Sequence, residues 1–151
     1  MKLPPPKKYE RERGSVAAEL VILLPVFLLL FFAILEFGNF MAIKNNLTSA
    51  AREGARIGVL PGAAASDVRD RIISALAEWK ISFDAVDVYI GSDDFKADDA
   101  PYEAIGAGQI LQITIVMAYE NFGLVPQFFA SFFPDAVGTV IMRKETINAG
   151  A

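Results

Sequence analysis

The sequence contains no cysteine and no histidine. Without cysteine the chain has no disulfide bonds and no thiolate zinc sites, and without histidine it has no imidazole-ligated metals. Catalysis by a nucleophile that histidine activates is excluded for the same reason. No spacing of carboxylates, or of serine and lysine, singles out another catalytic arrangement. We therefore expect a protein that is not an enzyme and that holds no metal or cofactor.

Basic residues are scarce after the first 14 positions. Residues 1–14 carry five basic and two acidic residues, a net charge of +3, whereas the remaining chain carries nine basic and sixteen acidic residues, a net charge of -7. This acidic remainder lacks the basic patch that nucleic-acid phosphates need, so we expect no nucleic-acid binding. Positive charge beside a membrane span stays cytoplasmic. The asymmetry thus predicts a cytoplasmic N-terminus and a larger part on the other side of a membrane.

A long apolar run follows the basic segment. Leu20 to Leu35 contains no charged residue, and the apolar pattern continues to Ile43 with only Glu36 interrupting it. As a helix, the first stretch rises about 24 Å and the longer one about 36 Å, compared with roughly 30 Å of hydrocarbon in a bilayer. The leucine, isoleucine, valine and phenylalanine residues from Leu20 to Leu35 favour membrane insertion by roughly 4 to 8 kcal/mol. We expect a single membrane span.

A cleaved secretory signal is the other interpretation of an apolar run near the N-terminus. The run is longer than the apolar core of such a signal, and no small-x-small cleavage site follows it. The next residues, "EFGNFMAIKNNL", continue a helical pattern. The apolar segment is therefore expected to be retained.

Helical character extends well beyond the apolar run. One helix is expected from near Ser15 to near Leu60, where Pro61-Gly62 ends it. Small residues recur at i, i+4 and i+8 along this helix, namely Ala50, Gly54 and Gly58. Such a stripe lets another backbone approach closely, and that backbone belongs either to another helix or to the protein's own sheet. We assign residues 15–62 to a transmembrane and stalk helix.

The remaining residues, 63–151, are expected to form a small head. Ser66 has the position of an N-cap for an amphipathic helix with Val68, Ile72, Leu76 and Trp79 on one face. Three segments have strand character: 85–91, with Val86, Val88 and Ile90 alternating against polar residues, then 109–120 and 138–147. The predicted fold class is α+β: a long N-terminal transmembrane and stalk helix, then one amphipathic helix packed on an antiparallel sheet of about three strands.

Two loop segments of the head allow more than one interpretation. Asp93, Asp94, Asp98, Asp99 and Glu103 are the kind of carboxylates that bind calcium, but they lack the EF-hand spacing, and a solvated acidic loop explains them as well. Further along, the segment 121–134, "NFGLVPQFFASFFP", holds five phenylalanines around Pro126. It closes the core as a short helix, contacts the membrane surface, or docks a partner subunit.

The junction between the basic segment and the apolar run resembles the processing site of the type IV prepilin group. Gly14 ends the basic segment, the small residue Ser15 follows it, and Glu19 lies five positions after the glycine. The resemblance implies a leader peptide, residues 1–14, that a membrane prepilin peptidase removes between Gly14 and Ser15. Cleavage exposes an amine that is largely protonated at neutral pH. An ionisable residue in a membrane segment is a functional-site hypothesis by default, and we expect Glu19 to pair with the amine of a neighbouring subunit.

The resemblance narrows to the TadE-like pseudopilins of the tight adherence (Flp-type) pilus system. In that family the Gly-x-x-x-x-Glu site occurs together with Leu-Pro in the span, Glu-Phe-Gly near its end, and Ala-Arg-Glu-Gly-Ala-Arg. Here these motifs are Gly14 with Glu19, Leu24-Pro25, Glu36-Phe37-Gly38 and Ala51 to Arg56. In the last of them Glu53 is expected to reach Arg56 at i+3. Leu20 departs from the family, whose members often have an aromatic residue there, which weakens any expectation of aromatic stacking between subunits.

The resemblance implies a peptidase-processed component of pilus biogenesis that is not an enzyme and acts as an assembly factor or minor subunit. Its partners would be the prepilin peptidase, other pilins or pseudopilins, the inner-membrane assembly platform and the lipid bilayer. Its location would be the bacterial inner membrane, with one span and a periplasmic head, and pilus association is left open. The alternative from another class is an uncleaved, single-pass anchored protein whose head binds a ligand or ion.

Overall fold

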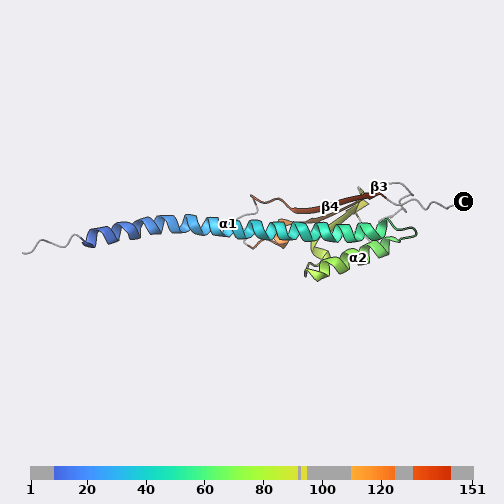
Figure 1. The fold of residues 1–151 in the computed structure, drawn as a ribbon, viewed down its shortest axis with the longest axis horizontal. Helices are drawn as coiled ribbons and strands as arrows, with labels where there is room; N and C mark the ends of the chain where they lie inside the picture. Colours follow the sequence, from blue (N-terminus) through green and yellow to red (C-terminus); the bar gives the residue numbers. More distant parts are fainter. Residues whose placement is uncertain (1–8, 92, 95–109, 125–130, 144–151) are drawn as a thin grey trace, which may run out of the picture. The chain divides into compact units, whose positions relative to one another are not determined.

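The computed structural model describes residues 9–91, 93–94, 110–124 and 131–143 (Figure 1). The chain divides into two units, Met1–Phe37 and Gly38–Ala151. The helix α1 (Tyr9–Gly58) is the one described element of the first unit, and its last residues belong to the second unit together with all other elements. The second unit, which we call the head from here on, begins at Gly38 and includes the end of α1.

Helix α1 is the long N-terminal helix that the sequence predicts. Its backbone is already helical at Tyr9, earlier than the expected start near Ser15, and it ends at Gly58, close to the expected end. Pro25 lies inside it. A proline removes one backbone donor, which apolar membrane helices tolerate. The chain leaves the helix through Pro61-Gly62, where Gly62 has φ +78° in the left-handed region that favours glycine.

The second helix, α2 (Ala65–Glu78), begins with a different cap from the one expected. Its N-cap is Ala64, whose backbone is extended, and the Asp67 carboxylate accepts a hydrogen bond from the Ala64 backbone N–H at 2.9 Å. The prediction that Ser66 is the N-cap is therefore wrong, because Ser66 is already the second helical residue. Alanine offers no side-chain acceptor, so the carboxylate three residues later satisfies this donor instead.

Removing this cap has a measurable expected cost. Asp67→Ala should lower the free energy of unfolding by about 0.5–1 kcal/mol, because it removes both the acceptor and a negative charge in the first helical turn. Ser66→Ala is the matched control and should change stability by less than about 0.5 kcal/mol. Urea unfolding of the full chain in detergent, followed by the fluorescence of Trp79, measures both changes. A larger loss for Ser66→Ala would contradict this assignment of the cap.

The head contains one antiparallel sheet with the strand order β2-β1-β3-β4. Its strands are β1 (Asp87–Ile90), β2 (Asp93–Asp94), β3 (Ile110–Met117) and β4 (Ala136–Arg143). Strand β3 is central and pairs with β4 over its full length, from Ile110 opposite Arg143 to Met117 opposite Ala136. Three strands make up most of the sheet, as expected, and the two-residue β2 is the addition. Short 3-10 helices, η1 (Phe83–Ala85) and η2 (Tyr119–Asn121), precede β1 and follow β3.

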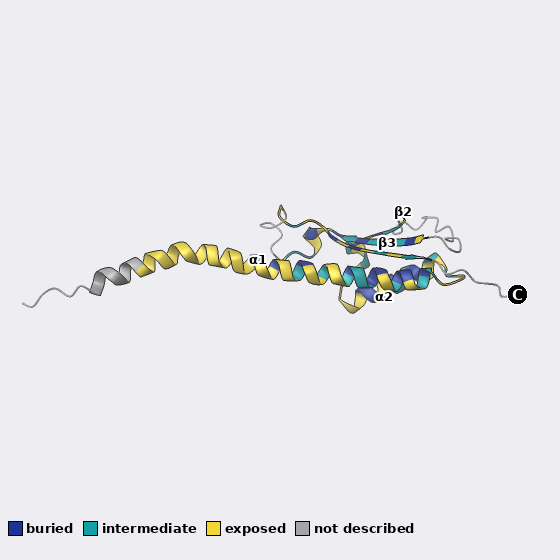
Figure 2. Ribbon diagram, turned by 45° about the horizontal axis from the view of Figure 1, so that its top comes forward, coloured by how far each residue is buried: buried dark blue, intermediate teal, exposed yellow. Residues whose placement is uncertain are grey.

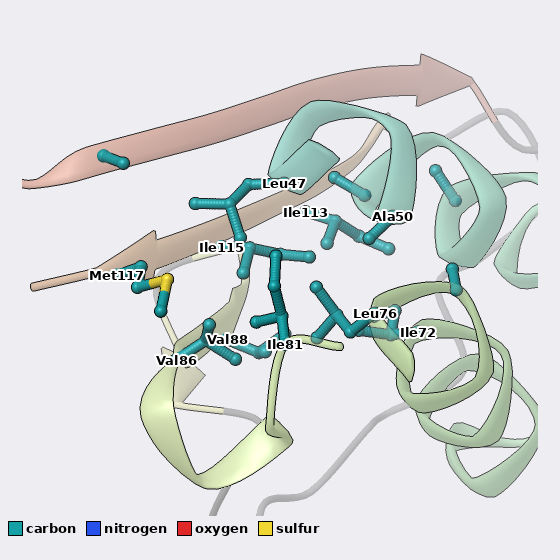
Figure 3. Close-up of a cluster of buried hydrophobic side chains, with 14 of the residues drawn as sticks. Leu47, Ala50, Ile72, Leu76, Ile81, Val86, Val88, Ile113, Ile115 and Met117 are labelled. Atoms are coloured by element: carbon teal, nitrogen blue, oxygen red, sulfur yellow. The ribbon is translucent and has the colours of Figure 1, made fainter. Parts of the chain in front are cut away.

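The second part of α1 and the helix α2 pack on one face of this sheet, and Figure 3 shows the side chains between them. The core combines residues of both helices with the inward-facing residues of the strands: Leu47, Ala50, Ala51, Ala55, Val68, Ile72, Leu76, Val86, Val88, Leu111, Ile113 and Ile115. The predicted alternation in β1 and the apolar face of α2 are thus confirmed. Trp79 is the exception, because it follows the last helical residue and is 36% exposed.

Two glycines mark the closest contacts between elements of the head. A Cβ atom on Gly54 of α1 would lie 2.6 Å from the Ile72 side chain of α2. A Cβ atom on Gly138 of β4 would lie 2.5 Å from the backbone carbonyl carbon of Leu47 and equally close to the backbone nitrogen of Thr48. Strand β4 therefore approaches α1 more closely than any side chain would permit.

Candidate functional site

The proposed cleavage point lies within a helical stretch of backbone. Helix α1 contains both Gly14 and Ser15, with residues 9–13 forming its start. A glycine inside a helix is less stable than alanine by roughly 0.5–1 kcal/mol. Gly14 is thus a position where the helix opens more readily than at its neighbours. Local opening would give a peptidase access to the bond that the sequence singles out.

Glu19 lies on α1, one helical turn after Ser15, and its side chain is exposed. No hydrogen bond or ion pair involves Glu19 within the part of the chain that the structure describes. Its carboxylate is therefore available to a group outside this chain.

The apolar run beside Glu19 is uncovered in a single chain. Every leucine, isoleucine, valine and phenylalanine from Leu20 to Leu35 is exposed, and Figure 2 shows this part of α1 almost entirely in the colour for exposed residues. Soluble monomers rarely expose an apolar surface of this size. Among the described helices, only α1, over Val16–Gly58, is long and apolar enough to cross a membrane. It has the length and composition of a membrane anchor.

Glu36 is a further candidate residue, although the sequence indicated it only as part of the Glu36-Phe37-Gly38 motif. It is only 1% exposed, and among the described residues it is the one charged residue that is buried. No buried side-chain oxygen or nitrogen in the described residues lacks a hydrogen-bond partner. Helical spacing gives the signal for its burial, because Glu36 shares a face of α1 with the buried residues Phe40 and Leu47.

The small stripe of α1 is buried in the head. Ala50 is fully buried, Gly54 and Gly58 are buried as well, and the space beside Gly54 is filled by Ile72 of α2 and Ile113 of β3. The sequence left open whether the stripe packs against another helix or against the protein's own sheet. In the structure it packs within the protein's own head, against α2 and β3. This stripe therefore positions α1 on the core and is not an open surface for a second subunit.

Comparison with known proteins identifies the part of the chain that carries these features. Residues 14–56 match the model of the family described as TadE-like protein. The expected resemblance is thereby confirmed over residues 14–56, which we call the TadE-like segment. No curated protein and no solved structure matches the chain.

The TadE-like segment covers two kinds of surface. It begins at Gly14, includes Glu19, the apolar run and Glu36, and extends to Arg56 inside the head. Its later residues supply the buried face of α1 on which α2 and the sheet are assembled. The match thus spans both the anchor and the helix around which the head is built.

One ion pair joins the TadE-like segment to the rest of the head. The Arg71 guanidinium donates two hydrogen bonds to the Glu53 carboxylate, at 2.8 Å from Nη2 and 3.1 Å from Nε. The predicted partner Arg56 is wrong, because the packing of α2 beside α1 brings Arg71 to the same carboxylate. Both side chains are more than a third exposed, so the pair contributes no more than about 1 kcal/mol.

The acidic segment of the head lies only partly within the described residues. Asp93 and Asp94 form the short strand β2 and do not belong to a loop, whereas Asp98, Asp99 and Glu103 lie outside the described residues. Within residues 9–91, 93–94, 110–124 and 131–143, no group of three metal-ligating side chains comes together. The calcium interpretation of this segment thus gains no support from the described residues.

Proposed function

We propose that this protein is a pseudopilin-like component of tight adherence pilus biogenesis that a prepilin peptidase processes, and that it acts as an assembly factor or minor subunit. The TadE-like match that begins at Gly14 is the observation that carries the proposal. It coincides with the boundary between the basic segment and an apolar helix that is exposed in the single chain. Catalysis by the protein itself is not part of this function.

Processing would act on the Gly14–Ser15 bond and would change the electrostatics of the N-terminus. Removal of residues 1–14 takes away five basic and two acidic residues and leaves one new amine at Ser15. The retained chain then begins with a positive charge one helical turn before Glu19. The basic segment keeps the N-terminus on the cytoplasmic side until cleavage, and the head lies on the periplasmic side of the inner membrane.

Glu19 would fix the axial alignment of neighbouring subunits. Once α1 is in the membrane, water no longer solvates this carboxylate fully, and an opposite charge at the same depth stabilises it. A protonated amine of an adjacent pilin or pseudopilin fits that requirement, and low dielectric strengthens the attraction while desolvation of both groups offsets part of it. The apolar side chains from Leu20 onward would pack against lipid and against the helices of these partners.

The processing step is tested by the mass of the N-terminus. In a host that contains a prepilin peptidase, the membrane-fraction protein should begin at Ser15, and Gly14→Ala should leave the whole leader attached. The matched control is Gly38→Ala, which introduces the same methyl group at a helical glycine with nothing within 4 Å of the new atom. This control should be processed like the natural sequence. Mass spectrometry of the three purified chains gives the answer directly.

The same measurement distinguishes the processed pseudopilin from the alternative, an uncleaved anchored protein whose head binds a ligand or ion. An intact Met1 start in a host with an active peptidase would contradict processing and would favour the uncleaved anchored protein. Cleavage of Gly14→Ala at the same bond would show that the peptidase does not read the glycine. The first result would remove the pseudopilin mechanism and leave the membrane anchor in place, whereas the second would contradict only the role of Gly14 in recognition.

A further inference from the structure

The segment after β3 is fixed to α1 at the start of the head. The Asn39 side-chain amide donates a 2.7 Å hydrogen bond to the backbone carbonyl of Phe122, although 83 residues separate the two in sequence. Asn39 is the second residue of the head unit. The segment that follows β3 therefore returns to the first helical turn of the head.

Four aromatic rings hold this segment in place. Phe40 of α1 lies 6.1 Å from Phe122 and 5.7 Å from Phe133, measured between ring centroids. Tyr119 stacks on Phe133 at 5.7 Å and meets Phe122 edge-on at 5.2 Å. These separations lie in the range where aromatic pairs attract one another. The core-closing interpretation of the phenylalanine-rich segment therefore applies to Phe122 and Phe133, whereas Phe128 and Phe129 lie outside the described residues.

Two apolar side chains of the same segment are exposed instead of packed in the ring cluster. Phe132 is 79% exposed and Leu124 is 60% exposed. Each lies within two residues of an anchored ring, Phe133 for the first and Phe122 for the second, so the cluster sets the position of both. At this exposure Phe132 contributes little to the core, and its place beside a packed aromatic cluster makes it available for a contact outside the head.

The place where the ring cluster contacts α1 indicates which partner its exposed neighbours can reach. Asn39 and Phe40 come four and five residues after Leu35, the last residue of the uncharged apolar run. Four helical residues rise about 6 Å. The headgroup layer on each side of the hydrocarbon core is about 5–8 Å thick. Because Leu20 to Leu35 rises only about 24 Å, a helix that begins at Leu20 and crosses about 30 Å of hydrocarbon reaches the headgroup boundary near Asn39 and Phe40. The helical turn that holds the Phe122–Phe133 cluster is therefore at the boundary between acyl chains and headgroups when the apolar run is in a membrane.

The charges around this part of the head favour an apolar contact over an electrostatic one. Lys44 is exposed on the next turn of α1, but Glu120 is exposed beside the cluster and the Asp135 carboxylate accepts a hydrogen bond from the Tyr119 backbone N–H. Acidic groups next to the ring cluster give no attraction to anionic lipids. Recognition would rest on burial of apolar side chains at the headgroup and acyl-chain boundary.

We propose that Phe132 and Leu124 insert into the bilayer interface and form a second membrane contact of the head, separate from the α1 span. The contact fixes the head on the lipid surface before the subunit meets any partner. It requires α1 to be inserted but does not require cleavage at Gly14. It is therefore independent of the processing that defines the proposed function.

Quenching of a single tryptophan by brominated lipid tests this contact. With Trp79→Phe as the background, Phe132→Trp and Leu124→Trp place the probe at the proposed contact in the full chain. The chains are reconstituted in phosphatidylcholine vesicles and in vesicles of phosphatidylethanolamine and phosphatidylglycerol, each containing lipid brominated on the acyl chain near the headgroup. Ile141→Trp on β4, at a site 62% exposed, is the matched control, and Phe27→Trp reports insertion of the span.

The expected result is quenching of Phe132→Trp and Leu124→Trp several-fold stronger than that of Ile141→Trp, and equal in the two kinds of vesicle. Probes at both contact positions that behave like Ile141→Trp, while Phe27→Trp is quenched, would overturn the proposal and leave the anchor intact. A blue shift at Phe132→Trp that appears only after co-reconstitution with other pilus proteins, without lipid quenching, would assign the surface to a protein partner and would also overturn it.

Discussion

Glu19→Gln is expected to yield a chain that inserts and is processed normally but fails to assemble. The change keeps the shape of the side chain and removes its charge, so the neighbouring subunit's amine in the proposed pairing would lose its counter-ion. Removing one member of a buried charge pair typically costs about 2–5 kcal/mol, much of it from the charge left unpaired. That range corresponds to association weakened by at least about tenfold at each contact.

Insertion cannot account for such a loss. An acidic residue inside a membrane segment opposes insertion by up to about 3 kcal/mol, so its removal makes the span more favourable. Co-purification with the other pilins and counting of pili by electron microscopy measure assembly, while the Ser15 start measured by mass spectrometry reports processing. Glu19→Gln should lower the first two and leave the third unchanged.

Glu19→Asp is the control that separates charge from reach. It keeps the negative charge on a side chain shorter by one methylene, and it should retain partial assembly, above that of Glu19→Gln. Normal piliation with Glu19→Gln would show that the carboxylate has no electrostatic role. Equal loss with Glu19→Asp and Glu19→Gln would show that geometry and not charge decides.

Gly138→Ala is expected to destabilise the head more than Gly54→Ala or Gly38→Ala does. The added methyl group would lie 2.5 Å from backbone atoms of Leu47 and Thr48, and backbone in the middle of a helix cannot move aside as a side chain does. Overpacking of this kind costs about 1–3 kcal/mol, and more where the neighbour is rigid. A domain with a total stability of about 5–15 kcal/mol loses a substantial part of it.

A series of three glycines makes this prediction specific. Gly54→Ala meets the Ile72 side chain, which can rotate, and alanine also favours the helix by about 1 kcal/mol, so the net loss should be smaller. Gly38→Ala meets nothing within 4 Å and should be neutral or stabilising. Urea unfolding in detergent, followed by Trp79 fluorescence, gives the order. A smaller loss for Gly138→Ala than for Gly54→Ala would contradict the backbone contact between β4 and α1.

Periodicity predicted the elements of the fold but not the contacts between them. The continuous helix, the amphipathic α2 and three antiparallel strands all follow from local patterns of apolar residues. The partner of Glu53 does not, because Arg71 becomes its neighbour only when two helices pack, while Arg56 is nearer in sequence. Ser66 was an attractive cap by residue type, but the chain enters α2 two residues earlier and Asp67 has the right spacing.

The candidate site shows the same division between local and tertiary information. Gly14 and Glu19 are recognisable because a charge next to an apolar run is a local feature. The burial of Glu36 is not apparent from the sequence, because the apolar run before it indicates exposure to lipid instead. Likewise the separation of Phe132 from Phe133 into exposed and packed rings depends on where Phe40 and Tyr119 lie, which composition alone does not reveal.

The shared use of α1 limits how the head can be shed by proteolysis. Leu47, Ala50 and Ala51 are fully buried, so a protease that cuts at Arg52 or Arg56 removes the centre of the core together with the anchor. A cut in the exposed turn at Pro61-Gly62 has the same effect. A break before about Gly38 would keep the described core of the head together, whereas a cut within the last part of α1 would divide that core.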